Sequence, residues 1–423
     1  MRLLTLLVAA TATAWATSTR LPPSQDPWYK APKNFEKSSP GEILRIRAAP
    51  DNFSSTIPHC SAAYHILYRT TDTRFRPSWA VTTLLLPSPY TPSSAPATPL
   101  LSYQIPYNSV DIDSSPSYDN AAMTPPTGPV ASALSRGWLV VIPDFEGPTA
   151  SYGAGVQAGH ATLDSLRAVL TLSREPKPHK RTIGLITRYA LWGYSGGSIA
   201  TGFAAELSVQ YAPELSETIA GAALGGLAAN ITSPALDGLN ETTYVGLLFA
   251  LLLGTTNQYP DAYNFVVDSL KETGPYNRTG FLAVGKMTVL EAWANYAGQD
   301  IWAYFEQGEA VAHDMGVQRA FWRNAVMGYH GVPRMPLFVY HAVGDRFVPI
   351  ELTDAYVHRV CAVGARILFE RNTVGGHLAE IVNGQGRALT WLEGVLGGTT
   401  AAVPDGCVAR DVAVNATDVS DGF

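Results

Sequence analysis

The stretch GYSGG at residues 193–197 decides the fold, because it sets one serine among three glycines. The apolar run RYALW precedes it and the small-residue stretch SIATGFAAEL follows, which predicts a strand, a tight turn and a helix. A serine on such a turn has a strained backbone, and the neighbouring glycines remove side chains that would collide there. We therefore predict that Ser195 is presented at the turn as a nucleophile.

Strand-like and helical segments alternate on both sides of this motif. AAYHILYRTTD, SWAVTTLLLP, LLSYQIPY and the apolar GWLVVIPD predict strands, and DSLRAVLTLSRE predicts an amphipathic helix. MPLFVYHAVGD and ARILFERN resume the strand pattern, and ALTWLEGVL predicts a last helix. Short apolar strands between helices indicate an α/β fold with a mostly parallel central sheet covered on both faces.

The pattern changes at residues 229–331, where the apolar helical segments YVGLLFALLLG, AYNFVVDSLKE, VLEAWANY and IWAYFEQ dominate. We predict a signal peptide at residues 1–16, a core at 17–228, an inserted helical cap or lid at 229–331 and the rest of the core at 332–423. Residues 17–60 are proline-rich and predicted to be irregular. GLLFALLLG is apolar on all sides, so it is either buried or in contact with lipid.

The N-terminus has the pattern of a secretory leader. One arginine precedes a short apolar run, and Ala14-Trp15-Ala16 is an A-x-A cleavage site. We expect a secreted protein with no transmembrane segment, because no other apolar run reaches about 18 residues. A formal charge of −6 argues against nucleic acid as a partner. N-glycosylation sequons occur at Asn52, Asn230, Asn240, Asn277 and Asn415.

The chain has three cysteines, Cys60, Cys361 and Cys407. In a secreted protein, an odd number leaves one cysteine without a disulfide partner in the same chain. Cys361 and Cys407 both lie in the C-terminal part, and we expect them to form a structural disulfide that holds the tail to the helix TDAYVHRVC. Cys60 is then unpaired or pairs between chains. No HExxH motif or Cys/His cluster indicates a metal site.

A serine nucleophile needs a base, and the base needs an acid. Asp345 follows the strand FVYHA and His377 follows the strand ILFERN, so both lie at the strand ends where Ser195 is expected. The order Ser…Asp…His is that of α/β-hydrolases, in which His377 would take the serine proton and Asp345 would orient the imidazole.

Other histidines and acids fit less well. His341 lies within a strand and is expected in the core, and Asp354 and His358 lie on an exposed helix. Asp144 precedes the serine, so PDFEGP (143–148) is expected to be a hydrogen-bonded turn near the cleft.

The oxyanion of the reaction needs two donors. The Gly196 amide at the start of the following helix is the first candidate. Asn108, at the end of the strand LLSYQIPY, is the second, because this fold takes one donor from a loop after an early strand.

Several blocks together resemble the fungal secretory lipases of the lipase A type, from about residue 62 to 407. They are SYQ…SPSY (102–118), VVIPDFEG (140–147), GYSGG…AAELSVQYAPEL (193–215), HAVGDRFVP (341–349) and GGH (375–377). The resemblance implies an α/β-hydrolase with a helical cap and no cofactor, the nucleophile at Ser195, the acid at Asp345 and the base at His377. It also implies the Cys361–Cys407 bridge.

Two features depart from the family. Asn108 stands where the family typically has aspartate, so an amide replaces a carboxyl at this site. Ser114 stands where the family often has a cysteine bridged to the cap, and the cap of this chain has no cysteine.

The primary hypothesis is a secreted monomeric lipase that hydrolyses acylglycerol esters through an acyl-Ser195 intermediate, with transient contact between the cap and a lipid interface. The alternative is an esterase that deacetylates a small secondary metabolite, such as an acetylated terpenoid or polyketide. A peptidase has no specific support, and an intact Ser/Asp/His set argues against a non-catalytic binding protein. Chain-length preference separates the first two hypotheses.

Overall fold

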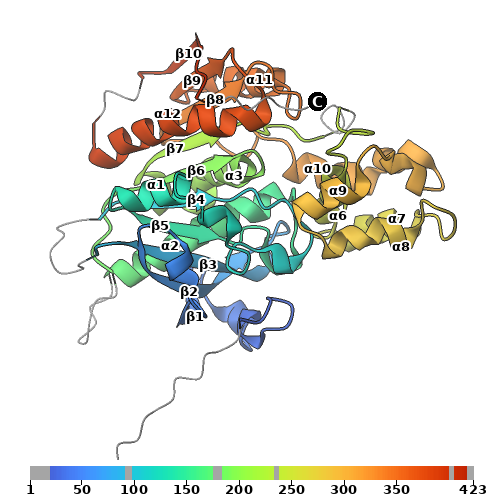
Figure 1. Ribbon diagram of the computed structural model, residues 1–423, viewed down its shortest axis with the longest axis horizontal. Coiled ribbons are helices and arrows are strands. Elements are labelled where there is room, and N and C mark those ends of the chain that lie inside the picture. The colour runs from blue at the N-terminus through green and yellow to red at the C-terminus, as the bar shows by residue number, and fades with distance from the viewer. Residues whose placement is uncertain (1–19, 91–97, 175–182, 233–237, 400–403, 417–423) are drawn as a thin grey trace, which may run out of the picture.

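A computed structural model describes residues 20–90, 98–174, 183–232, 238–399 and 404–416. A ten-stranded sheet runs through these residues in the order β1-β2-β3-β5-β4-β6-β7-β8-β9-β10 (Figure 1). Its strands are β1 (Ile43–Ala48), β2 (Cys60–Thr71), β3 (Pro77–Pro87), β4 (Leu100–Gln104), β5 (Leu139–Pro143), β6 (Tyr189–Tyr194), β7 (Ile219–Gly225), β8 (Leu337–Ala342), β9 (Ile367–Asn372) and β10 (Cys407–Val412).

The sheet is mostly parallel, as predicted. The strands from β5 to β10 pair in parallel, while β1, β2 and β3 form an antiparallel edge. The parallel strands are short and apolar because helices cover both of their faces. The mostly parallel central sheet of the α/β-hydrolase class is therefore confirmed.

The prediction of an irregular segment at 17–60 was wrong at β1. ILRIRA places two arginines among its apolar residues, because β1 is an edge strand that is only partly buried. A similar reason explains β10, which the sequence did not indicate: CVARDV is largely exposed and pairs with β9. The predicted strand ending at Asn108 was too long, since β4 ends at Gln104 and an extended loop follows.

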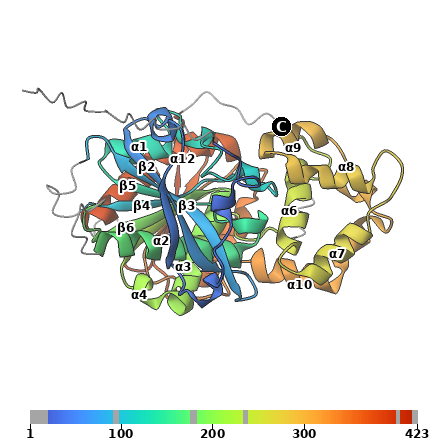
Figure 2. The ribbon, with the colours of Figure 1, turned by 90° about the horizontal axis from the view of Figure 1, so that it is seen from below.

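Helices α1 (Pro129–Ser135) and α12 (His377–Gly397) pack on one face of the sheet. Helices α2 (Gly155–Arg174) and α3 (Gly196–Tyr211) pack on the other, with α11 (Ile350–Cys361) beside them (Figures 1 and 2). Alternate residues of each strand enter the two cores. On β5, for example, Val140 faces α1 and α12 while Val141 faces α2 and α3.

Helices that we call the cap helices lie between β7 and β8 in the chain and together at one end of the molecule (Figure 2). They are α6 (Gly246–Thr256), α7 (Pro260–Asp268), α8 (Arg278–Leu282), α9 (Val289–Tyr296) and α10 (Met315–Asn324). The segment IWAYFEQ forms only a 3₁₀ turn at Ile301–Tyr304, and α10 was not foreseen.

Helix α6 is the cap helix nearest the core, and all of its residues are buried. Of the two alternatives predicted for GLLFALLLG, burial in the protein is therefore confirmed, and not contact with lipid. The apolar cluster on the α2 and α3 face continues through α6 into the other cap helices. The cap helices therefore share a core with the sheet.

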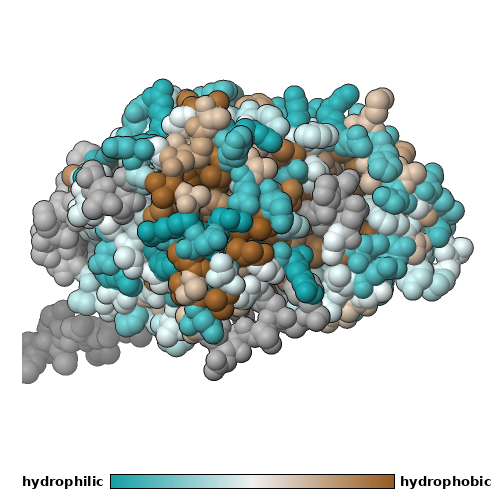
Figure 3. Space-filling view, turned by 90° about the horizontal axis from the view of Figure 1, so that it is seen from above, coloured by the Kyte–Doolittle hydropathy of each residue, from teal (hydrophilic) through white to brown (hydrophobic). Residues whose placement is uncertain are grey.

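Apolar side chains also reach the surface over the end of the molecule that carries α11, α12 and β10 (Figure 3). The exposed ones there include Val363, Ile381, Val382 and Val408. In the described ranges, no helix has the length and apolarity to span a bilayer. The predicted signal peptide at residues 1–16 lies outside the described residues.

Candidate active site

Ser195 lies on the turn between β6 and α3, where the GYSGG motif predicted it. Its backbone has φ 52° and ψ −123°, a positive φ that is rare for a residue with a side chain. The Ser195 amide donates to the Gly225 carbonyl of β7 at 2.9 Å, which extends the sheet up to the turn. The strained residue is therefore fixed by the neighbouring strand.

Close backbone contacts explain the glycines around Ser195. A Cβ atom on Gly193 would lie 2.2 Å from the Gly197 carbonyl oxygen, and one on Gly197 would lie 2.1 Å from that of Gln104. The helix α3 consequently starts immediately against β6 and β4. Only glycine at both positions permits this approach.

The structure brings the three predicted residues together by hydrogen bonds. His377 Nε2 lies 2.8 Å from Ser195 Oγ, and His377 Nδ1 lies 2.6 Å from Asp345 Oδ2. The Phe347 ring stacks on the imidazole at 4.8 Å, and Tyr194 donates its hydroxyl to the His377 carbonyl at 2.6 Å. These contacts hold the imidazole between the hydroxyl and the carboxylate, the geometry that proton transfer from serine requires.

Asp345 is buried, but its surroundings favour the ionised form of its carboxyl group. Its Oδ1 accepts hydrogen bonds from the amides of Phe347 and Val348, each at 2.9 Å. Burial opposes ionisation, but His377 and then His341 outweigh it and hold the pKa of Asp345 below its usual value. Asp345 can thus stabilise a positive charge on His377 at neutral pH.

His341 has a second role that the sequence did not reveal. It is buried in β8, as expected, but its Nε2 lies 3.0 Å from Asp345 Oδ2 and 3.0 Å from the Val348 carbonyl oxygen. The H-A-V-G-D spacing brings these two side chains together where the chain leaves the strand. His341 therefore helps to position the carboxylate.

Asn108 lies directly against the start of α3. A Cβ atom on Gly196 would lie 1.8 Å from Asn108 Oδ1, so the carboxamide rests on the glycine. Asn108 also has a positive φ of 47°, and Oδ1 has no hydrogen-bond partner among the described residues. The amide group is thus buried, held over the Gly196 backbone and available to a ligand at Ser195.

The turn PDFEGP places two buried carboxyls behind this loop. Asp144 accepts hydrogen bonds from the amide and hydroxyl of Ser117 at 2.9 and 2.5 Å. Burial raises the pKa of Asp144 to about 7 despite these bonds. Burial also raises the pKa of Glu146, and neither oxygen of its carboxyl group has a hydrogen-bond partner among the described residues. The expected structural turn is confirmed.

A cavity of about 50 Å³ adjoins the serine, histidine and asparagine. Apolar side chains close it on the cap side. Its lining is Asn108, Tyr152, Ser195, Gly196, Ile199, Ala228, Ile231, Leu239, Leu247, Leu248, Leu251, Phe347, Val348 and His377. A space of this size accommodates a few atoms.

A larger cavity of about 450 Å³ lies among the cap helices. Its size is in the range of small-molecule sites, and its walls are mostly apolar with a few polar groups. The lining is Asn230, Thr232, Leu248, Leu252, Ile301, Trp302, Ala312, Val317, Gln318, Phe321 and Trp322.

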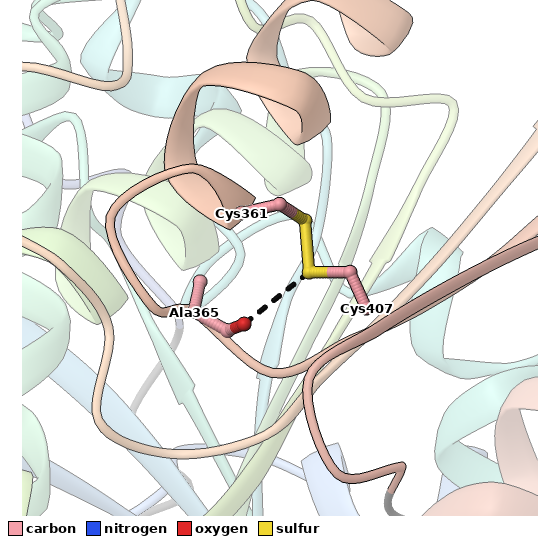
Figure 4. The surroundings of a disulfide bond; sticks show 3 residues. All are labelled: Cys361, Ala365 and Cys407. Carbon is pink, nitrogen blue, oxygen red and sulfur yellow. Dashed lines mark hydrogen bonds between the residues drawn. A yellow bond between two sulfur atoms is a disulfide. The ribbon is translucent and has the colours of Figure 1, made fainter.

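The Cys361–Cys407 disulfide is present and joins the end of α11 to the start of β10 (Figure 4). The Cys407 sulfur lies 3.2 Å from the Ala365 carbonyl oxygen in the connecting turn. Cys60 is a free, partly buried thiol at the start of β2, and burial raises its pKa to about 11. Ser114, where the family often has a bridging cysteine, is buried.

The five sequons differ in exposure. Asn52 and Asn415 are exposed. Asn230, Asn240 and Asn277 are partly buried, and their side chains bond neighbouring groups. Across the residues that the structure describes, no group of three or more His, Cys, Asp or Glu side chains could hold a metal ion.

A sheet of this order, with a serine on the turn after β6 and a histidine and an aspartate beside it, defines an α/β-hydrolase. Its named relatives, which are lipases and esterases, make it a carboxylic ester hydrolase. The chain belongs to the secretory lipase family, whose sequence model matches residues 126–403.

Relatives include both esterases and lipases. The chain is 47% identical to "Trichothecene C-3 esterase" of Fusarium sporotrichioides over 95% of this chain and 90% of that protein. It is 43% identical to "Probable trichothecene esterase SAT6" of Stachybotrys chartarum over 93% and 81% of the two chains. The crystal structure of Candida antarctica lipase A superposes with a TM-score of 0.79, at 26% identity, over 95% and 92%.

Proposed function

We propose that Ser195, Asp345 and His377 form a catalytic triad for ester hydrolysis. The observation that carries the proposal is the continuous hydrogen-bonded path from Ser195 Oγ through both nitrogens of His377 to Asp345. His377 Nε2 takes the hydroxyl proton as Oγ attacks the ester carbonyl carbon. The same proton then passes to the departing alcohol, and water resolves the acyl-Ser195 intermediate with His377 again as base.

The negative charge of the tetrahedral intermediate requires donors on the side opposite His377. We assign the first to the Gly196 amide at the start of α3. The second is Asn108, whose side-chain amide rests on Gly196 and lines the cavity at Ser195. Rotation of the carboxamide about its last bond exchanges oxygen and nitrogen at the Gly196 contact, so Nδ2 can donate there.

We further propose that the substrate is a short acyl ester of a bulky alcohol, namely the acetyl ester of a small secondary metabolite of the trichothecene type. The cavity of about 50 Å³ beside Ser195 supports this proposal, because it has room for an acetyl group and not for a fatty acyl chain. The identity of 47% to a trichothecene C-3 esterase supports the choice of alcohol.

Hydrolysis of acylglycerols is the second candidate. The apolar cap cavity of about 450 Å³ favours it, since that volume could receive a longer acyl chain. In both cases we propose that residues 229–331 act as a cap over the serine, and that the chain is secreted, monomeric and glycosylated at its sequons. Under this second candidate the cap would meet a lipid interface transiently.

The test is hydrolysis of p-nitrophenyl acetate, octanoate and palmitate, together with a trichothecene acetylated at C-3, by the wild-type protein and Ser195→Ala. We expect acetate and the acetylated trichothecene to be hydrolysed best. Ser195→Ala should lower turnover by roughly 10⁴-fold or more, since the triad acts as a unit. A preference for palmitate would support the lipase, and undiminished turnover by a clean Ser195→Ala preparation would overturn the triad.

A further inference from the structure

The two cavities lie on opposite sides of one thin wall. Helix α6 forms most of it: Leu247 and Leu251 line the cavity at Ser195, whereas Leu252 lines the cap cavity. Residues four apart lie on one face of a helix, so each face of α6 serves one cavity.

The segment at residues 230–232 completes the wall. Ile231 lines the cavity at Ser195, while Asn230 and Thr232 line the cap cavity. Asn230 pairs with Val326 in an isolated β-bridge, and Thr232 donates hydrogen bonds to the Asn230 side chain, so these contacts hold the segment in place.

Among the described residues, Leu248 is the one side chain that lines both cavities. It is 2% exposed and comes from the middle of α6. Any path between the cavities that crosses α6 therefore runs past Leu248.

The backbone of α6 has little freedom to open the wall. A Cβ atom on Gly254 would lie 2.4 Å from the Tyr152 carbonyl oxygen, and one on Gly246 would lie 2.4 Å from that of Ala292. Both ends of the helix are thus in close backbone contact, one with the core and one with α9. The side chain at position 248 is consequently the part of the wall that can be changed without moving the helix.

We propose that Leu248 is a specificity-determining residue that separates the acyl site at Ser195 from the cap cavity and so restricts the enzyme to short acyl groups. This inference rests on the proposed esterase function and adds to it the residue that sets the acyl limit. Without the leucine branch, an acyl chain that begins at Ser195 can continue into the apolar cap cavity, among Trp302 and Phe321.

The experiment compares kcat/KM for p-nitrophenyl octanoate with that for the acetate in Leu248→Ala. We expect the octanoate-to-acetate ratio to rise by roughly tenfold or more over the wild-type ratio, as in other apolar pockets that gain room for methylene groups. Leu252→Ala is the matched control, because Leu252 lines only the cap cavity and its truncation leaves the wall closed.

A folded Leu248→Ala protein with the wild-type ratio, or an equal rise in Leu252→Ala, would overturn the inference. Leu248→Val and Leu248→Phe extend the test if the alanine variant does not fold, with a smaller rise expected for valine and a fall for phenylalanine. The proposed function fails separately, if the wild-type protein does not hydrolyse acetyl esters or does so without Ser195.

Discussion

Two residues with a strained backbone meet at the active site of this protein. Ser195 and Asn108 both have positive φ without being glycine, and they meet across Gly196. Such conformations cost on the order of 1–3 kcal/mol each and persist where surrounding contacts fix them. Their coincidence beside a cavity supports a site at which one hydroxyl and one amide are held ready for a substrate.

The Asn108 side chain gives a prediction about pH. Asn108→Ala should lower kcat by about 10²-fold with little change in KM, because the donor acts mainly in the transition state. Relative to the wild type, Asn108→Asp should be most active at low pH and lose activity as pH rises, since a carboxyl donates only when protonated. Profiles of kcat against pH for the three proteins measure both effects. Full activity in Asn108→Ala would mean that backbone amides alone hold the oxyanion.

Asp144 predicts a pH effect on stability. Its pKa is about 7 in the folded protein and near 3.8 as an unperturbed side chain, so the folded state binds this proton more tightly. The resulting stabilisation is complete below about pH 4 and is lost as pH rises through 7, up to about 4 kcal/mol.

Urea unfolding of the wild-type protein and Asp144→Asn at about pH 4 and pH 8 tests this. The wild-type free energy of unfolding, relative to that of the variant, should fall between the two pH values. A difference that is the same at both would show that Asp144 is ionised in the folded protein.

At the scale of elements, α6 is both part of the wall of the active-site cavity and the helix on which α7, α9 and α10 pack. Its hydrophobic residues face the core on one side and the cap on the other, which is why it is apolar all round. The position of α6 depends on close approach of its backbone to neighbouring chain segments. Packing of this helix therefore controls both stability and the shape of the site.

Gly254→Ala should destabilise the protein by about 1–3 kcal/mol, because the new methyl group would meet the backbone of Tyr152. Gly386→Ala on α12 is the matched control, since a Cβ atom there meets no atom within 4 Å. The control should stabilise the protein by up to about 1 kcal/mol through helix propensity. The measurement is the thermal unfolding midpoint of both variants. Equal changes in the two midpoints would contradict the close packing of α6 against Tyr152.

At the scale of the whole molecule, the edge of the sheet formed by the C-terminal strand β10 is largely exposed to solvent. Strand β10 is mostly exposed, and apolar residues gather on the face of the molecule seen in Figure 3. The Cys361–Cys407 bridge ties this strand to α11 across 46 residues of chain. The disulfide therefore stabilises an edge strand that gains little stability from burial in the hydrophobic core.

Replacing Cys361 and Cys407 together with serine should lower the free energy of unfolding by about 4 kcal/mol or less, the entropy of closing a loop of this length. Hydrogen exchange should become faster in β10, and exchange in the central strands β4 and β6 should speed up only as far as the global free energy of unfolding falls. Cys60→Ser, which removes the free thiol, should leave both measurements near the wild-type values. Equal exchange in β10 with and without the bridge would argue against this role.

The sequence by itself determined the features that depend on local pattern and on order. GYSGG between a strand and a helix predicted the serine turn, because glycine spacing reports close backbone contacts. Apolar runs predicted the central strands, and the order of Ser195, Asp345 and His377 placed all three at one edge of a parallel sheet. These signals are carried by a few neighbouring residues, so they can be read without the fold.

Only the tertiary structure decided how distant segments share space. The half-polar strands β1 and β10 could not be recognised because edge strands have little need of apolar residues. Packing also places the carboxamide of Asn108 on Gly196 and the Leu248 side chain between two cavities. Packing depends on the sum of many contacts across the chain, and no short stretch of sequence records that sum.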